Sequence, residues 1–380
     1  MKNVFDKMRE IGADKKIADF KVKQQQDFPF KRLYAERRAW EFYNHEEIAG
    51  NAYVAVGGLD SITLMIFLRS IGIEVPAVSV SQLEDVSIQR VHKALGVTRL
   101  KPATKQNGRP WTKPEIIKEF GWPILSKEIA GKISLLQRPS EKNATVRHAI
   151  ITGETGEYGG FQTDSRMKMS QRWLELFGGA DPEGAALGYK AAPFLVSDRC
   201  CYYLKEKPCN DYARESGRFP YMGLMASEGG RREKALMMHG CNYISPGTKR
   251  SAPFAIFYRD DLLRLTLEMD AWYHEHWQEF SDVHLKTIVP EIYGNIVEGP
   301  DGELLTTGAQ RTGCSVCAFG LHMEKRPHRF DLLYRTNRKE WEFWMLQMGL
   351  GDVLDYIGVE WRPQLTIFDM LAGQEKREAT

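Results

Sequence analysis

Four of the six cysteines fall in two short motifs that could bind a metal. They are an adjacent pair and a distant Cys-x-x-Cys, formed by Cys200, Cys201, Cys314 and Cys317. A disulfide framework is typical of short secreted chains, whereas this chain has 380 residues and begins without an apolar signal segment. Adjacent thiolates suit a single tetrahedral zinc poorly, because structural zinc usually takes spaced ligands. An iron-sulfur cube offers separate irons to neighbouring thiolates, so these motifs favour an iron-sulfur centre.

The second chemical feature is the turn Val-Gly-Gly-Leu-Asp-Ser at residues 56–61. Two glycines before a helix start let backbone N–H groups converge on an anion, helped by the positive end of the helix dipole. Asp60 could hold a divalent cation against phosphates. The Walker and dinucleotide-binding fingerprints are both absent. In the alternative interpretation the glycines only make a tight turn, and Asp60 and Ser61 cap the helix.

The elements around this turn alternate between strand and helix. An apolar run at 52–57 precedes it, a helical stretch at 61–71 follows, and a second apolar run occupies 73–80. A further helix is expected around 86–95. This alternation predicts a mostly parallel sheet with right-handed crossovers. We therefore expect an α/β protein with a doubly wound, mainly parallel sheet.

The remaining pattern suggests three regions. Residues 1–50 are rich in Lys, Gln, Arg and aromatic side chains and predict a helical extension outside the main sheet. Residues 51–195 hold the glycine turn and form the expected nucleotide-binding α/β domain. Residues 196–380 hold every cysteine and are expected to complete the same globule as an iron-sulfur and substrate-binding region.

Within these regions three more segments have a recognisable pattern. Residues 111–133 predict helix, broken at Gly121 and Pro123. Residues 149–152 are a short apolar run and predict a strand. Residues 153–187, rich in glycine and charge, predict an excursion away from the sheet.

Composition sets bounds on the class of protein. The chain is 43% hydrophobic and 27% charged, with a formal net charge of +2, as in ordinary globular proteins. A net charge of this size identifies no partner. The sequence has no apolar run long enough to cross a membrane, so we expect a cytoplasmic protein without a membrane partner.

Taken together, these residues resemble a known family. The stretch VAVGGLDSITLM is similar to the PP-loop of the adenine nucleotide alpha-hydrolase superfamily, a group of ATP pyrophosphatases. The later motifs resemble its phosphoadenosine phosphosulfate reductase-like branch, and the resemblance covers roughly residues 40–360. Those motifs are FGWPILSKEIAGKI (120–133), CCYYLKEKP (200–208), GLMASEGGRRE (223–233), GCN (240–242) and TGCSVCAFGLHMEKRPHRF (312–330).

The resemblance implies a set of site residues. It places nucleotide phosphates on Gly57, Gly58, Leu59, Asp60 and Ser61, with Mg²⁺ near Asp60, and it implies the fold of the superfamily. In relatives the four cysteines of the two motifs hold a [4Fe-4S] cluster. The segment after residue 223 looks like the family's site for anionic substrates, where arginine offers planar bidentate contacts. Its charged residues are Glu228, Arg231 and Arg232, with solvated helix charges as the alternative.

Two positions depart from the family pattern. Val56 stands where the PP-loop usually has serine, and VSQLE at 80–84 stands where many relatives have D-T-G-L-E. The loss of one hydroxyl donor costs about 1 kcal/mol, which would weaken nucleotide binding without abolishing it. The Glu-Cys-Gly-Leu-His tail of assimilatory sulfonucleotide reductases is also missing from the C-terminal GQEKREAT.

Asp60 favours ATP as the nucleotide, because sulfonucleotide reductases generally lack this acid. The resemblance then implies ATP cleavage to AMP and pyrophosphate, followed by sulfur transfer to a nucleotide, a nucleic acid or a small phosphorylated acceptor. A sulfur-donor protein is an expected partner, and Cys241 or Cys209 is a candidate persulfide carrier; an inert buried thiol is the alternative for Cys209. One alternative function is a reductase that needs a partner thiol. Another is a degenerate binding subunit of a larger assembly.

Two further groups of charged residues have weaker signals. The segment 322–339 is dense in Lys, Arg and His with interleaved aromatics, which suits a nucleic-acid or nucleotide backbone. A charged helix beside the cysteines explains it equally well. His274 and His276 lie two residues apart, on different faces of a helix, so we interpret them as structural or surface residues.

Overall fold

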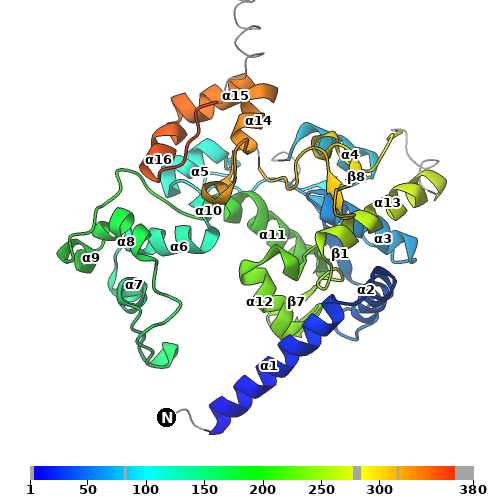
Figure 1. Ribbon diagram of the computed structural model, residues 1–380, viewed down its shortest axis with the longest axis horizontal. Helices are drawn as coiled ribbons and strands as arrows, with labels where there is room; N and C mark the ends of the chain where they lie inside the picture. Colours follow the sequence, from blue (N-terminus) through cyan, green and yellow to red (C-terminus); the bar gives the residue numbers. More distant parts are fainter. Residues whose placement is uncertain (1–3, 81–83, 277–283, 315, 364–380) are drawn as a thin grey trace, which may run out of the picture. The chain divides into compact units, whose positions relative to one another are not determined.

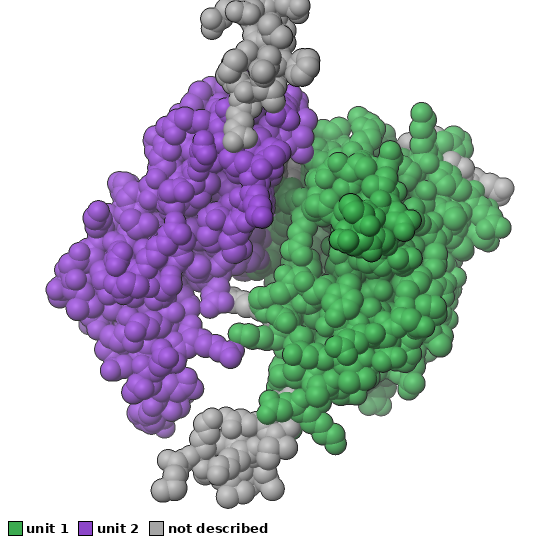
Figure 2. Space-filling model, viewed as in Figure 1, with its two compact units in different colours: residues 1–102, 205–314 green, residues 103–204, 315–380 purple. Residues whose placement is uncertain are grey.

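The computed structural model describes residues 4–80, 84–276, 284–314 and 316–363. The chain forms two compact units, coloured separately in Figure 2. Unit 1 contains residues 1–102 and 205–314, and unit 2 contains residues 103–204 and 315–380. The chain therefore changes unit after residues 102, 204 and 314, rather than at the expected divisions after residues 50 and 195.

Unit 1 is built on a six-stranded sheet in the order β3-β2-β1-β5-β7-β6. Neighbouring strands run parallel except β6 and β7, which form an antiparallel hairpin. The prediction of an α/β chain with a mainly parallel sheet is confirmed. The strands are β1 (Ala52–Ala55), β2 (Ala77–Ser79), β3 (Thr98–Arg99), β5 (Phe219–Tyr221), β6 (Asn242–Ser245) and β7 (Thr248–Ser251).

The order of the strands reverses at β1. From β1 the chain continues to β2 and β3 on one side, and it later enters β5 on the other side. Val54 at the centre of β1 pairs with Ala77 of β2 and with Tyr221 of β5. Open α/β sheets bind ligands outside the carboxyl ends of the strands at such a reversal. The glycine turn at 56–61 directly follows β1 and lies at this point.

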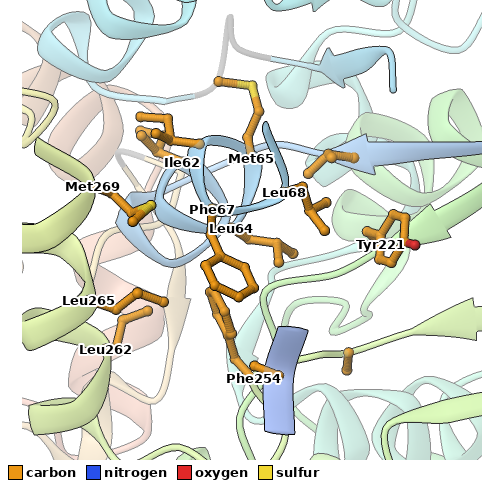
Figure 3. Packing of buried hydrophobic residues seen from close by; sticks show 14 of the residues in the cluster. Ile62, Leu64, Met65, Phe67, Leu68, Tyr221, Phe254, Leu262, Leu265 and Met269 are labelled. Carbon is orange, nitrogen blue, oxygen red and sulfur yellow. The ribbon is translucent and has the colours of Figure 1, made fainter. Parts of the chain in front are cut away.

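The helix after the glycine turn is anchored by burial. Helix α3 (Leu59–Ser70) is buried at nearly every position from Leu59 to Leu68 and packs on α13 (Arg259–His276). Figure 3 shows the apolar side chains of both helices in this core. A hydrogen bond of 2.8 Å joins the hydroxyls of Thr63 and Thr266. Each fully buried apolar side chain contributes roughly 1.5–3 kcal/mol, so the start of α3 is held rigidly behind the turn.

The N-terminal region is helical, as expected, and contributes to the core of unit 1. It contains α1 (Val4–Gln24) and α2 (Phe28–Tyr43). Phe42 of α2 packs edge to face on Tyr221 of β5, and the Tyr221 hydroxyl donates a hydrogen bond of 2.7 Å to the Ala39 carbonyl. Other elements of unit 1 are α4 (Val86–Ala94), α11 (Lys207–Ser216), α12 (Gly230–His239), β8 (Ile296–Glu298) and β9 (Leu304–Thr306).

Unit 2 is mostly helical (Figure 1). The expected break in the helical region 111–133 is confirmed, since α5 ends at Phe120 and α6 begins at Lys127. Its described α-helices are α5 (Lys113–Phe120), α6 (Lys127–Leu136), α7 (Ala144–Thr152), α8 (Gln171–Phe177), α9 (Pro182–Ala186), α10 (Arg199–Cys201), α14 (Arg329–Thr336), α15 (Arg338–Glu342) and α16 (Leu350–Tyr356). A short parallel ladder joins β4 (Ile124–Leu125) and β10 (Ala318–Phe319).

The strand expected at 149–152 is wrong, because these residues form the last turn of α7. Ala149, Ile150 and Ile151 are buried there against other helices of unit 2. A four-residue apolar run cannot by itself distinguish a buried strand from a buried helical turn. Among the described residues, no helix combines the length and apolar composition needed to span a bilayer.

Candidate functional site

The glycine turn is closed by its own hydrogen bonds. The Gly57 N–H donates to Ser61 Oγ at 2.7 Å, and the Ser61 hydroxyl donates to the Gly58 carbonyl at 3.0 Å. Helix α3 begins at Leu59, and the residue before it, Gly58, has no side chain that could cap the helix. Ser61 therefore closes the turn locally, as in the alternative interpretation, whereas the Asp60 side chain pairs with Arg259. The first N–H groups of α3 remain directed out of the helix, as an anion site requires.

Two residues from a distant segment cover part of this turn. The Leu59 N–H donates to the Tyr293 hydroxyl at 3.1 Å, and that hydroxyl also bonds Thr312 Oγ1. A Cβ on Gly58 would lie 2.5 Å from the Tyr293 oxygen, so a side chain at this position would push the Tyr293 hydroxyl away. A phosphate that accepts from the Leu59 N–H must replace the Tyr293 hydroxyl. No local pattern predicts this contact, since 234 residues separate Leu59 from Tyr293.

Asp60 is paired with an arginine that sequence reasoning did not identify. Arg259 Nη1 lies 2.8 Å from Asp60 Oδ1, and its Nη2 donates to the Gln310 carbonyl at 3.1 Å. Burial raises the pKa of Asp60, and the Glu228 carboxylate adds to this, while the Arg259 guanidinium opposes it. A cation near Asp60 must share the carboxylate with Arg259 or displace that side chain.

The loop after β5 packs directly on the glycine turn. A Cβ on Gly223 would lie 2.9 Å from the Asp60 carbonyl carbon, so the two backbones are in contact. Glu228 pairs with Arg232 at 2.6 Å and acts electrostatically on Asp60. The structure thus brings Glu228 toward the turn, with Arg232 as its ion-pair partner. The side chain of Arg231 lies outside the described part of the chain.

The two departures from the family pattern have different surroundings. Val56 is buried in the apolar core of unit 1, and its N–H donates to the Val78 carbonyl within the sheet. A serine there would place a hydroxyl in an apolar environment. Of the segment 80–84, residues 81–83 lie outside the described residues. Glu84 is buried and pairs with Lys205 at 2.7 Å.

The four expected metal ligands are divided between the units. Cys200, Cys201 and Cys317 belong to unit 2, whereas Cys314 is the last residue of the 205–314 segment of unit 1. Among the residues that the structure describes, no three Cys, His, Asp or Glu side chains are grouped to hold a metal. The cluster therefore stays a prediction, supported by the kind of donors and their sequence spacing.

Residues 122–125 connect two of the cysteine segments within unit 2. The Trp122 N–H donates to the Leu195 carbonyl at 2.7 Å, shortly before Cys200. On the same segment, β4 pairs with β10, which directly follows Cys317. The Arg329 guanidinium fixes the Cys317 carbonyl at 3.1 Å. Residues 122–125 therefore form backbone hydrogen bonds both with the segment before Cys200 and with the strand after Cys317.

Gly121 is where this arrangement is most easily tested. Its φ is 106°, and an added Cβ would lie 2.3 Å from the Leu195 carbonyl carbon. Gly121→Ala is expected to lower the free energy of unfolding by about 2–3 kcal/mol, because both the backbone conformation and the contact resist a side chain. Denaturant unfolding measures this. Gly131→Ala in α6 is the control, since nothing lies within 4 Å of the added carbon and alanine favours helix. Equal stability of both variants would contradict the geometry.

The chain after Cys201 has an unusual helical form. Residues Tyr202–Glu206 form a π-helical turn, a rare conformation that is frequent at functional sites. Lys205 on this turn is the residue that pairs with Glu84. Within unit 1, Glu84 lies beside the glycine turn, because its Oε1 is 3.8 Å from the position of a Gly57 Cβ.

The two candidate persulfide carriers are in unfavourable surroundings. Burial raises the pKa of the Cys241 thiol to about 11, and its side chain bonds Tyr34. Burial also raises the pKa of Cys209 to about 11. Sulfur carriers react as thiolates, and a thiol with such a pKa is almost fully protonated at neutral pH. A catalytic role of Cys241 stays a prediction that this environment disfavours.

The basic segment 322–339 is largely engaged within the protein. Arg326 pairs with Asp331 and, at 3.1 Å, with Glu360; Arg329 pairs with Glu324. These contacts favour a charged helix near Cys317 over a polyanion-binding surface. Other predicted cationic residues of the segment, Lys325 and Arg335, are exposed.

His274 and His276 bond the backbone carbonyls of Lys286 and Trp272, as expected of structural or surface residues.

No protein-family model, curated protein or solved structure matches this chain.

Proposed function

We propose that the chain binds an adenine nucleotide at the glycine turn and cleaves ATP to AMP and pyrophosphate as part of a sulfur transfer. The observation that supports this most is the position of the turn, which follows β1 at the reversal of strand order. The loop after β5 is in contact with it. We also propose that the fold is that of the adenine nucleotide alpha-hydrolases, as the PP-loop resemblance implies.

In this proposal the turn binds the phosphates through backbone N–H groups. The Gly58 and Leu59 N–H groups donate to phosphate oxygens, and the N-terminal end of α3 adds a positive potential. Asp60 holds Mg²⁺ against the same phosphates, while Arg259 and Arg232 supply positive charge. Magnesium usually binds one or two carboxylates together with phosphate oxygens, which suits a single acid here.

The reaction itself is an exchange of oxygen for sulfur. An acceptor oxygen attacks the α-phosphorus of ATP, the bond to pyrophosphate breaks, and the acceptor becomes adenylated. A donor at the sulfide oxidation level then attacks the activated carbon, and AMP leaves with the original oxygen. This sequence needs no separate oxidant or reductant. The acceptor is a nucleotide, a nucleic acid or another phosphorylated molecule.

The four motif cysteines would hold the [4Fe-4S] cluster. They are Cys200, Cys201, Cys314 and Cys317, and four thiolates are the usual donor set of such a cluster. When bound, the cluster supplies an iron site that can hold sulfur or transfer an electron. The residues 122–125 would position the Cys200 and Cys317 segments through the backbone contacts described above.

A second candidate function is a sulfonucleotide reductase that takes its thiol from a partner. The ion pair between Asp60 and Arg259 favours the reductase, because a carboxylate that is already paired with an arginine is less available to Mg²⁺. A reductase does not need that metal, since its nucleotide arrives already activated. A third candidate is a nucleotide-binding subunit without turnover. It is favoured by buried Val56 and by the Tyr293 hydroxyl on the Leu59 N–H.

Anaerobically purified protein incubated separately with Mg²⁺-ATP and with phosphoadenosine phosphosulfate distinguishes these functions. We expect AMP and pyrophosphate from ATP, whereas adenosine bisphosphate and sulfite would favour the reductase. Binding without products would favour the third candidate. Gly58→Ala should lower activity, because the added Cβ would crowd Tyr293 and Thr312 at the turn. Gly131→Ala should leave activity unchanged. No binding of either nucleotide would overturn the proposal.

A further inference from the structure

A buried histidine contacts the glycine turn from the side of α4. His92 is 2% exposed, and its Nε2 lies 2.7 Å from the Gly57 carbonyl oxygen. A carbonyl oxygen only accepts hydrogen bonds, so Nε2 must carry the proton. Burial lowers the pKa of His92, which keeps the ring neutral near pH 7. Nδ1 is then an unprotonated nitrogen, and it has no hydrogen-bond partner among the described residues.

His92 bonds the peptide between Gly57 and Gly58 itself, whereas Ser61 bonds the Gly57 N–H and the Gly58 carbonyl on either side of that peptide. Gly57 and Gly58 both lack a Cβ, so the peptide between them could turn over at low cost. The peptide is trans, since the only cis bond of the described residues precedes Pro327. In a planar trans peptide the C=O and the N–H point in opposite directions. Fixing the Gly57 carbonyl toward His92 therefore directs the Gly58 N–H away from α4.

The hydrogen bonds of the turn leave that N–H available. Gly57 donates to Ser61 and Leu59 donates to Tyr293, whereas the Gly58 N–H has no partner among the described residues. A donor without a partner at the start of a helix is the group that an anion would use.

We propose that His92 is a positioning residue, whose Nε2–H holds the Gly57 carbonyl and thereby directs the Gly58 N–H toward the anionic group of a bound ligand. The identity of that group as a nucleotide phosphate rests on the proposed function. The orientation of the peptide does not, because it follows from the contact and from peptide geometry.

A buried ion pair lies beside the ring. Glu84 is buried and pairs with Lys205 at 2.7 Å, and both act electrostatically on His92 in opposite directions. The pair therefore leaves little net charge to favour a protonated ring. This arrangement suits a fixed neutral donor better than a group that exchanges protons during turnover.

Three substitutions separate positioning from packing. In His92→Gln the amide nitrogen reaches the place of Nε2, in His92→Asn it reaches only the place of Nδ1, and in His92→Leu no donor remains. With inorganic pyrophosphate and with ATP as probes, we expect the Gln variant to bind within about threefold of the wild type. The Asn and Leu variants should bind about tenfold more weakly, as expected for the loss of one well-aligned donor. Thermal unfolding identifies any variant that fails to fold.

Nitrogen NMR of the ligand-free protein provides a test that needs no nucleotide. We expect His92 to be protonated at Nε2 and bare at Nδ1, and the Gly58 amide signal to move in the Asn variant but not in the Gln variant. The opposite tautomer, or equal Gly58 shifts in both, would overturn the role of His92. Equal binding by the folded Gln and Asn variants would also overturn it. A wild type that binds neither probe but shows the expected NMR result would overturn the proposed function alone.

Discussion

Replacing Asp60 by asparagine is expected to slow pyrophosphate release from ATP by at least about a hundredfold. An amide keeps the size of the carboxylate but carries no charge to hold Mg²⁺ against the phosphates. The loss of one well-placed electrostatic group in an active site typically costs about 3–4 kcal/mol of transition-state stabilisation. Pyrophosphate release under saturating ATP and Mg²⁺ measures the effect.

The same substitution should preserve stability. Burial raises the pKa of Asp60, which means that folding disfavours the ionised carboxylate near neutral pH despite Arg259. Asparagine removes that cost and can still accept a hydrogen bond from the guanidinium. Asp355→Asn, which breaks a surface pair with Arg362 in unit 2, is the control and should leave turnover unchanged. Unchanged pyrophosphate release in Asp60→Asn would show that the turn does not bind magnesium as proposed.

The direction of the pKa shift also fixes the sign of a pH dependence. A raised pKa means that protons compete with Mg²⁺ for Asp60 at pH values above the ordinary range of an aspartate, near 4. Turnover should therefore fall as the pH is lowered through this raised pKa and reach a plateau above it. A profile of kcat/KM against pH tests the direction.

The sequence was most informative where the signal was local. A short apolar run, two glycines and a long apolar helix identified β1, the turn and α3, because each element shows its own periodicity and its own boundary residues. The alternation with α4 was enough to predict a mainly parallel sheet. The run at 149–152 was misinterpreted because four apolar residues fit a buried helical turn equally well.

The partners of the turn could not be predicted in the same way. His92, Tyr293 and Arg259 reach it from three separate elements, and none has a local pattern that would distinguish it from other charged or aromatic residues. Tertiary packing alone decides that they meet Gly57, Leu59 and Asp60. The ion pairs of Arg326 with Asp331 and of Arg329 with Glu324 could not be predicted for the same reason, because a basic composition does not show which acidic side chains lie nearby.

Loss of a single motif cysteine is expected to remove the iron-sulfur cluster. Anaerobically reconstituted wild type should be brown and contain about four iron and four sulfide per chain. Cys317→Ser should lose most of both, because one iron of the cube would have no thiolate ligand. Its free energy of unfolding should also fall, since metal-binding energy is partly folding energy. Iron and sulfide analysis with visible absorbance measures the first effect, and denaturant unfolding the second.

Cys209→Ser provides the matched control for this prediction. Cys209 lies in α11 in the same C-terminal half of the sequence, but burial raises its pKa to about 11, so it is a poor thiolate ligand. The control should keep its iron, and Cys200→Ser and Cys314→Ser should lose iron as Cys317→Ser does. Zinc in stoichiometric amount, with neither iron nor sulfide after reconstitution, would replace the cluster with a different metal centre. Iron retained in all three motif variants would exclude these cysteines as its ligands.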